Sequence, residues 1–150
     1  MFEEQPYEEV AYEITTLENQ NQHLGMGMIG ELENGLDEKE FLQFLKKTMK
    51  TDCVRHSALL HKSIKRVAVL GGSGSFAIDA AKNAGADAFI SADFKYHDFF
   101  KTENTMLLAD IGHYESEQYT KDLLHSFLKK KITNFAVLLS QTNTNPISYL

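Results

Sequence analysis

Arg66-Val-Ala-Val-Leu-Gly-Gly-Ser-Gly-Ser75 is the stretch of sequence that decides the fold. The short apolar run at 66–70 is typical of a buried strand, and the glycine-rich turn after it leads into helical spacing over 76–83. Gly85 is placed to end this helix, and Ala86-Asp-Ala-Phe-Ile-Ser91 predicts the next strand. A strand, a helix and a second strand in this order indicate a βαβ unit, whose two strands lie parallel in one sheet.

The same alternation continues on both sides of this unit. After it, the sequence predicts a short helix at 95–101, a strand at 105–110, a long helix from about 113 to 131 and a last buried strand at 135–140. Before it, the sequence predicts a strand at 7–14, a glycine-punctuated strand at 25–32 and a helix capped by Asp37. We therefore expect an α/β fold with α/β/α layers and a mostly parallel or mixed sheet.

Composition and charge limit the classes of protein. The chain has 150 residues, 43% of them hydrophobic, and its formal net charge is −6. Residues 1–40 contain 11 acidic residues and one basic residue, which sets this stretch apart from the rest of the chain. The acidic balance makes nucleic acid an unlikely partner. The absence of an apolar run of ~20 residues and of a secretory signal predicts no membrane association, and a single cysteine, Cys53, predicts a reducing, cytoplasmic location.

The glycine-rich turn admits three interpretations. Gly72-Ser-Gly-Ser-Phe-Ala77 fits the G-x-G-x-x-A pattern of dinucleotide-binding proteins, and Asp93 lies 21 residues after Gly72, where a carboxylate would bind ribose. A less specific hypothesis is that the backbone amides of this turn bind an anion, with Gly72, Ser73, Gly74 and Ser75 as the candidate residues. The simplest interpretation is a turn that lets the backbone bend between strand and helix.

Two pairs of potential metal ligands follow two predicted strands. His113 and Glu117 are four residues apart, so on a helix that begins near His113 their side chains share one face. Asp93 and His97 follow the preceding strand with the same spacing. The carboxyl ends of parallel strands are where open α/β sheets bind ligands, and imidazole with carboxylate suits a divalent transition metal. The alternative is a capped helix start with a solvated Glu117.

Several motifs together resemble the NIF-three-like family, whose members are also called GTP cyclohydrolase 1 type 2 homologues. The motifs are Gly25-Met-Gly-Met-Ile-Gly-Glu-Leu32, Val67-Ala-Val-Leu-Gly-Gly-Ser-Gly-Ser75, Ala86-Asp-Ala-Phe-Ile-Ser-Ala-Asp-Phe-Lys-Tyr-His97, Asp110-Ile-Gly-His-Tyr-Glu-Ser-Glu117 and Asn145-Pro146. Residues 6–14 resemble the last strand of the PII- or copper-tolerance-like domain that longer members carry as an insertion.

The resemblance implies a dinuclear site for zinc, manganese or iron in a cleft between two related α/β lobes. His113 and Glu117 match family ligands, and Asp93 and His97 are weaker candidates, with His97 also a candidate for proton transfer. The family's other ligands, a paired histidine and an aspartate, have no match in this chain. The resemblance therefore implies the C-terminal half of a longer protein, with residues 1–22 as the end of the inserted domain and a linker, and residues 23–150 as one lobe.

Three functions from different classes follow from these observations. The first is a metal-dependent hydrolase that acts on a nucleotide-like or other phosphorylated small molecule, with the isolated chain metal-poor and inactive. The second is a metal-binding regulatory or scaffold protein without catalysis, because the family forms homo-oligomers. The third is a dinucleotide-binding module, which the glycine pattern alone supports.

Overall fold

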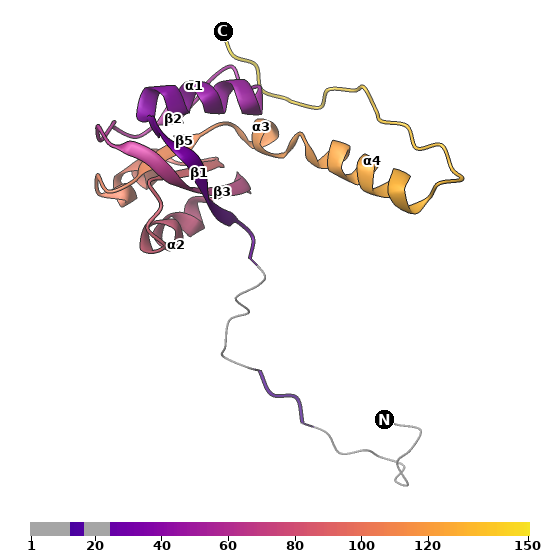
Figure 1. Cartoon of the computed structure of the whole chain (residues 1–150), viewed down its shortest axis with the longest axis horizontal. Helices are drawn as coiled ribbons and strands as arrows, with labels where there is room; N and C mark the ends of the chain where they lie inside the picture. The colour runs from indigo at the N-terminus through magenta and orange to yellow at the C-terminus, as the bar shows by residue number, and fades with distance from the viewer. Residues whose placement is uncertain (1–12, 17–24) are drawn as a thin grey trace.

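A computed structural model of the chain describes residues 13–16 and 25–150 (Figure 1). Its elements in chain order are β1 (Met28–Asp37), α1 (Glu38–Met49), β2 (Arg55–His56), β3 (Ser63–Ser73), the 3-10 helix η2 (Ser75–Ala77), α2 (Ile78–Asn83), β4 (Ala88–Ala92), the 3-10 helix η3 (Tyr96–Thr102), β5 (Leu107–Asp110), α3 (His113–Glu117) and α4 (Thr120–Lys131).

One mixed sheet of five strands forms the centre of the fold, in the order β1-β3-β4-β5-β2. The three inner strands, β3, β4 and β5, are parallel, as the predicted βαβ units require. The two outer strands are antiparallel to their neighbours: β1 pairs with β3, and the two-residue β2 pairs with β5. The carboxyl ends of β3, β4 and β5 therefore meet at one edge of the sheet.

Helices cover both faces of this sheet, which confirms the predicted α/β/α layers (Figure 1). Side chains alternate along a strand, so neighbouring residues of β4 enter different cores: Phe89 packs in the cluster with Ile78 of α2, and Ile90 packs in the cluster with Phe41 of α1. Met106, Leu107 and Leu108 are likewise fully buried. The two cores hold the parallel strands, and hence the loops at their ends, in fixed positions.

The first described helix begins where the sequence predicts. The Asp37 side chain accepts a hydrogen bond from the backbone N–H of Lys39, which is a typical N-cap contact, and α1 starts at the next residue. The preceding strand is longer than predicted, since β1 spans Met28–Asp37 rather than 25–32.

The predicted helix at 113–131 is wrong in one respect, because the structure divides it into α3 and α4. The side chains of Gln118 and Tyr119, which lie between α3 and α4, form hydrogen bonds with the end of α1. Gln118 Nε2 donates to the carbonyl of Met49, and the Tyr119 hydroxyl donates to the carbonyl of Thr48. These two bonds satisfy carbonyls at the end of α1, and they fix where α3 stands relative to the sheet.

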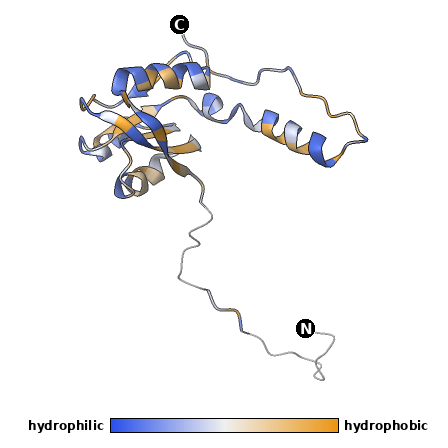
Figure 2. Cartoon of the chain, in the orientation of Figure 1, coloured by the Kyte–Doolittle hydropathy of each residue, from blue (hydrophilic) through white to orange (hydrophobic). Residues whose placement is uncertain are grey.

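The predicted strand at 135–140 is also wrong. The segment has no regular structure, and Phe135 and Leu138 are 71% and 91% exposed. A strand needs a neighbour for its backbone hydrogen bonds, and this segment pairs with neither β1 nor β2, the strands at the two edges of the sheet. Figure 2 shows α4 and the tail after it as a separate projection that carries hydrophobic residues away from the sheet.

The predicted strand at 7–14 falls mostly outside the described residues. Only Glu13 and Ile14 of that strand are described, and they have no regular structure. The division into residues 1–22 and 23–150 stays a prediction. Within residues 13–16 and 25–150, every helix is too short or too polar to cross a bilayer.

Asp98 stabilises η3 in a way that depends on pH. Its carboxylate is buried, accepts a hydrogen bond from Lys95 N at 2.9 Å and forms an ion pair with Lys101 Nζ at 2.8 Å. The hydrogen bond from Lys101 is the main reason why the pKa of Asp98 lies below its ordinary value, and the Lys95 amide adds to it. A lowered pKa in the folded state means that this stabilisation is present above the unfolded pKa of about 3.9 and is lost as the pH falls through the folded pKa.

We predict that Asp98→Asn lowers the free energy of unfolding by about 1–2 kcal/mol at pH 7, and that the difference from the wild type shrinks as the pH falls below about 4. Urea unfolding at a series of pH values measures both effects. Asp79→Asn is the control, because its ion pair with Lys82 is exposed and should change stability by less than about 0.5 kcal/mol. A difference between Asp98→Asn and the wild type that is independent of pH would contradict the charged hydrogen-bond network.

Candidate metal centre

The candidate site lies at the edge where the three parallel strands end. Asp93 follows β4 directly, and His113 begins α3 three residues after the last residue of β5. Gly72 and Ser73 form the end of β3. The fold thus brings together residues that are 20 to 45 positions apart in the sequence, in the place where open α/β sheets bind their ligands.

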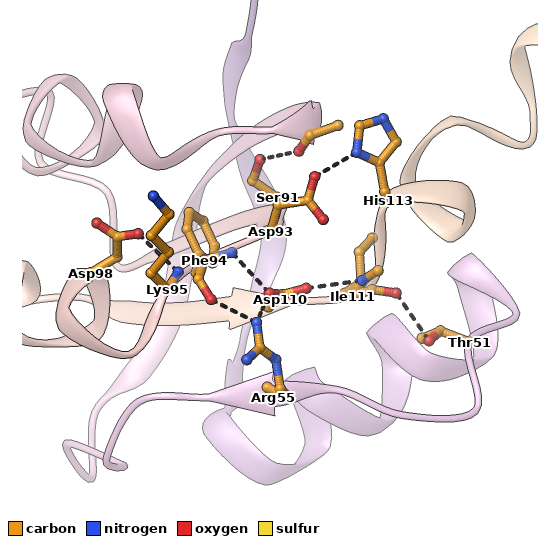
Figure 3. A network of polar contacts seen from close by, with 12 residues as sticks. Thr51, Arg55, Ser91, Asp93, Phe94, Lys95, Asp98, Asp110, Ile111 and His113 are labelled. Carbon is orange, nitrogen blue, oxygen red and sulfur yellow. Dashed lines mark hydrogen bonds and ion pairs between the residues drawn. The ribbon is translucent and has the colours of Figure 1, made fainter. Parts of the chain in front are cut away.

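The buried carboxylate of Asp110 holds two of these loops together (Figure 3). Its Oδ2 accepts a hydrogen bond from Phe94 N at 3.1 Å, after β4, and its Oδ1 accepts one from Gly112 N at 3.1 Å, after β5. Arg55 of β2 forms an ion pair with the same carboxylate and also donates to the carbonyl of Phe94. The residues next to Asp93 and His113 are therefore anchored to one buried charge.

The imidazole of His113 stands between two carboxylates. Its Nδ1 lies 2.6 Å from Asp93 Oδ2, and its Nε2 lies 3.4 Å from Glu117 Oε2. The side chains of all three residues are about half exposed. The hydrogen bond to Asp93 is the main cause that raises the pKa of His113 above its ordinary value; partial burial opposes it, and the charges of Asp93 and Glu117 add to it.

His113 and Glu117 share one face of α3, as their spacing predicts, and their separation fits a common metal. Two donors that are each about 2.1 Å from a tetrahedral zinc ion lie about 3.4 Å apart. The distance between His113 Nε2 and Glu117 Oε2 is 3.4 Å. The pair could therefore contribute two ligands to one divalent ion without rearrangement of α3.

Gly72 leaves the space beside this pair open. Its φ is +69°, and a Cβ atom built on it would lie 2.5 Å from Glu117 Oε1 and 3.3 Å from His113 Nε2. Ser116 ties the two segments together, because its hydroxyl accepts a hydrogen bond from Gly72 N and donates one to the carbonyl of His113. Only glycine combines this backbone conformation with so close an approach.

The glycine-rich segment differs from the turn that the sequence predicts. β3 continues to Ser73, and the helix after it is only six residues long and is preceded by η2. Gly72 N donates to Ser116 Oγ, and Gly74 N donates to the carbonyl of Ala92. Because both amides already have partners inside the protein, this geometry does not favour a dinucleotide, and anion binding by Ser73 and Ser75 stays a prediction.

His97 lies on η3, where its ring packs edge-on against Tyr96. In the part of the chain that the structure describes, no hydrogen bond or ion pair joins His97 to His113 or Glu117. Within residues 13–16 and 25–150, no three His, Cys, Asp or Glu side chains converge on one metal position. The structure brings Asp93 to His113, and the candidate ligands that share one open position are the pair His113 and Glu117.

A cavity of about 660 Å³ adjoins the pair. Its walls come from α3, from the first two turns of α4 and from residues 142–147, and they include His113, Glu117, Lys121, Thr142 and Asn145. Asn145 Nδ2 donates to Glu115 Oε1 at 3.0 Å, which fastens the tail to α3. The site therefore has room for a small molecule next to the two candidate ligands.

Sequence reasoning missed Asp110 and Ser116. Asp110 lies inside the apolar run Met106-Leu-Leu-Ala-Asp-Ile111. A buried acidic residue needs hydrogen-bond donors around it, so the sequence alone could have indicated a structural role for Asp110. Ser116 gave no signal, because its two partners are distant in sequence or are backbone atoms.

Comparisons with known proteins bear on this site. Residues 4–146 match the family described as Duf34/NIF3 (NGG1p interacting factor 3). The chain belongs to the Duf34/NIF3 family. The match covers the strands β3, β4 and β5 and the helix α3 that carry the candidate site.

Individual members of the Duf34/NIF3 family agree with this assignment. The chain is 35% identical to the "GTP cyclohydrolase 1 type 2 homolog" of Bacillus subtilis (strain 168), over 100% of this chain and 41% of that protein. The homologue of Staphylococcus epidermidis (strain ATCC 12228 / FDA PCI 1200) is 34% identical, over 96% of this chain and 40% of that protein. This chain therefore spans about two fifths of the length of these relatives.

Solved structures show the same fold. A Bacillus cereus protein related to NIF3 superposes with a TM-score of 0.73 at 31% identity, over 97% of this chain and 41% of that one. The Staphylococcus aureus protein SA1388 gives the same TM-score and identity, over 84% of this chain and 42% of that one. The α/β fold derived from the sequence is therefore the fold of this part of Duf34/NIF3 proteins.

We predict that Gly72→Ala disturbs the ligand pair. The left-handed backbone costs about 1–2 kcal/mol for a residue with a Cβ, and the new methyl group must push the Glu117 carboxylate away from His113. Thermal unfolding measures the loss of stability, and the NMR signals of the His113 ring report the displaced carboxylate. Gly30→Ala is the control, because a Cβ atom there meets no atom within 4 Å. Unchanged ring signals in Gly72→Ala would contradict the close approach.

We predict that Asp110→Asn lowers the free energy of unfolding by about 3 kcal/mol, because it leaves the buried ends of β4 and β5 without their charged acceptor. The NMR signals of Asp93 and His113 should shift with it. Asp87→Asn is a matched control, since Asp87 also accepts two backbone amides, those of Lys65 and Arg66, but at the opposite edge of the sheet. If Asp110→Asn left the signals of Asp93 and His113 unmoved, the anchoring role of Asp110 would be wrong.

Proposed function

We propose that His113 and Glu117 are two ligands of a divalent-metal site, and that this site serves a metal-dependent hydrolase acting on a nucleotide-like or other phosphorylated small molecule. The observation that carries the proposal is the 3.4 Å separation of His113 Nε2 and Glu117 Oε2 beside a cavity of about 660 Å³. The name "GTP cyclohydrolase 1 type 2 homolog" of the relatives supports a nucleotide-like substrate.

The roles of the chain's own residues follow from their positions. His113 and Glu117 would bind zinc, manganese or iron, and such an ion supplies an activated water and polarises the bond to be broken. The cavity beside them would hold the substrate, with Lys121 as the cationic residue in its wall. His97 remains a candidate for proton transfer.

The remaining ligands must come from outside the pair. Zinc sites in proteins use three or four protein ligands, and the described residues contribute two here. We infer that this chain corresponds to the C-terminal lobe of a longer protein, with two metals in the complete site. The coverage of about two fifths of each relative supports this inference.

A metal-binding regulatory or scaffold protein that forms homo-oligomers is the second candidate. The observation that favours it is α4, on which four apolar residues are exposed, namely Leu123, Leu124, Phe127 and Leu128. Figure 2 shows hydrophobic bands along this helix. A contiguous exposed apolar face is typical of a surface that contacts more protein. Metal-dependent turnover of a panel of nucleotides by the complete protein distinguishes the first candidate, which requires turnover, from the second, which does not.

We predict that this chain binds Zn²⁺ or Mn²⁺ weakly, and that His113→Ala lowers the affinity at least about 10-fold, because one of two ligands is removed. Titration calorimetry with each metal measures both values. His61→Asn is the control, since His61 precedes β3 at the opposite edge of the sheet and asparagine tolerates its φ of +56°. Equal affinity of His113→Ala and the wild type would remove His113 from the site. A tight complex of the wild type would show that further residues of this chain are ligands.

A further inference from the structure

Asp93 has a left-handed backbone conformation directly after β4. Its φ is +59°, in the left-handed region that residues with a side chain seldom occupy. Aspartate tolerates this conformation better than most residues, because its short polar side chain can form local hydrogen bonds. The conformation directs the Asp93 carboxylate toward the His113 ring, where Oδ2 lies 2.6 Å from Nδ1 (Figure 3).

The contact between Asp93 and His113 contributes little to stability by itself. Both side chains are 47% exposed, and ion pairs or charged hydrogen bonds at such positions are worth about 0–1 kcal/mol. The contact is therefore of more consequence for the His113 ring than for stability.

The contact with Asp93 determines which nitrogen of the His113 ring carries the proton. A neutral imidazole carries its proton on one ring nitrogen and presents a lone pair on the other. Because Asp93 accepts a hydrogen bond, it holds the proton on Nδ1, and the lone pair is left on Nε2. Nε2 is the nitrogen that faces Glu117 and the space that Gly72 keeps open.

We propose that Asp93 is a positioning residue that acts through His113: it orients the ring and fixes the tautomer in which Nε2 can bind a divalent metal. Carboxylates commonly hold metal-bound histidines in this way, and their loss lowers metal affinity by about 10- to 100-fold. This inference rests on the proposed metal site. It replaces the expectation that Asp93 is itself a ligand, because Asp93 contacts the ring nitrogen that lies away from Glu117.

The test reads the tautomer of His113 directly. The two ring nitrogens of histidine give different ¹⁵N shifts when one carries the proton, so a long-range ¹H–¹⁵N spectrum of the metal-free protein, at a pH at which the ring is neutral, assigns it. We expect the wild type to carry the proton on Nδ1. We expect Asp93→Gly to show a mixture of both tautomers, and Asp93→Asn, whose amide oxygen is a weaker acceptor, to lie between them.

Asp93→Gly and Asp93→Asn suit this purpose because both glycine and asparagine tolerate a left-handed backbone. Glu103→Gln is the matched control. Glu103 also has a positive φ, of +50°, and the substitution removes the same charge, but it lies before β5, at the opposite edge of the sheet. Calorimetric titration with Zn²⁺ and Mn²⁺ should give the wild-type affinity for Glu103→Gln and an affinity about 10- to 100-fold lower for Asp93→Gly.

Each outcome decides the proposal. A shifted tautomer with reduced affinity in Asp93→Gly supports it. An unchanged tautomer and unchanged affinity overturn it, and so does an unchanged tautomer with an affinity as low as that of His113→Ala, since Asp93 would then be a ligand. If the wild type binds neither metal, the proposed metal site fails, and the tautomers of the metal-free proteins still decide whether Asp93 orients His113.

Discussion

The buried carboxylate of Asp110 is the interaction on which the geometry of the site depends. It accepts hydrogen bonds from backbone amides of residues that follow β4 and β5. It also forms an ion pair with Arg55 of β2. A buried charge is stable only where donors surround it, so these three segments must lie together for the fold to form. Because Asp93 and His113 are neighbours of the anchored amides, the same requirement brings them to 2.6 Å of each other.

The candidate site lies on well-packed strands, but its own side chains are exposed to solvent. The strands beneath it are packed between two cores, whereas the side chains of His113 and Glu117 are about half exposed. A metal bound by this pair alone would keep most of its coordination positions free. Such a pair fits a role as part of a larger site, which agrees with the fraction of each Duf34/NIF3 relative that the chain spans.

Local patterns in the sequence predicted most of the fold. The apolar runs before Gly71 and after Gly85 identified β3 and β4, and the N-cap Asp37 located the start of α1. The segment 135–140 shows the limit of this approach. Its apolar run matches that of a buried strand, but the segment pairs with no strand of the described sheet, and a pattern within one segment carries no information about its neighbours.

The sequence by itself determined which residues could act at the site. The spacing of His113 and Glu117 fixes their common face, because four residues make about one turn of a helix. Only the tertiary structure decided how the other candidates are used. It placed Asp93 on the ring of His113, left His97 apart on η3, and bonded the amide of Gly72 to Ser116. These outcomes depend on contacts between segments 20 to 45 residues apart, which follow from how the strands pair and pack and not from any local pattern.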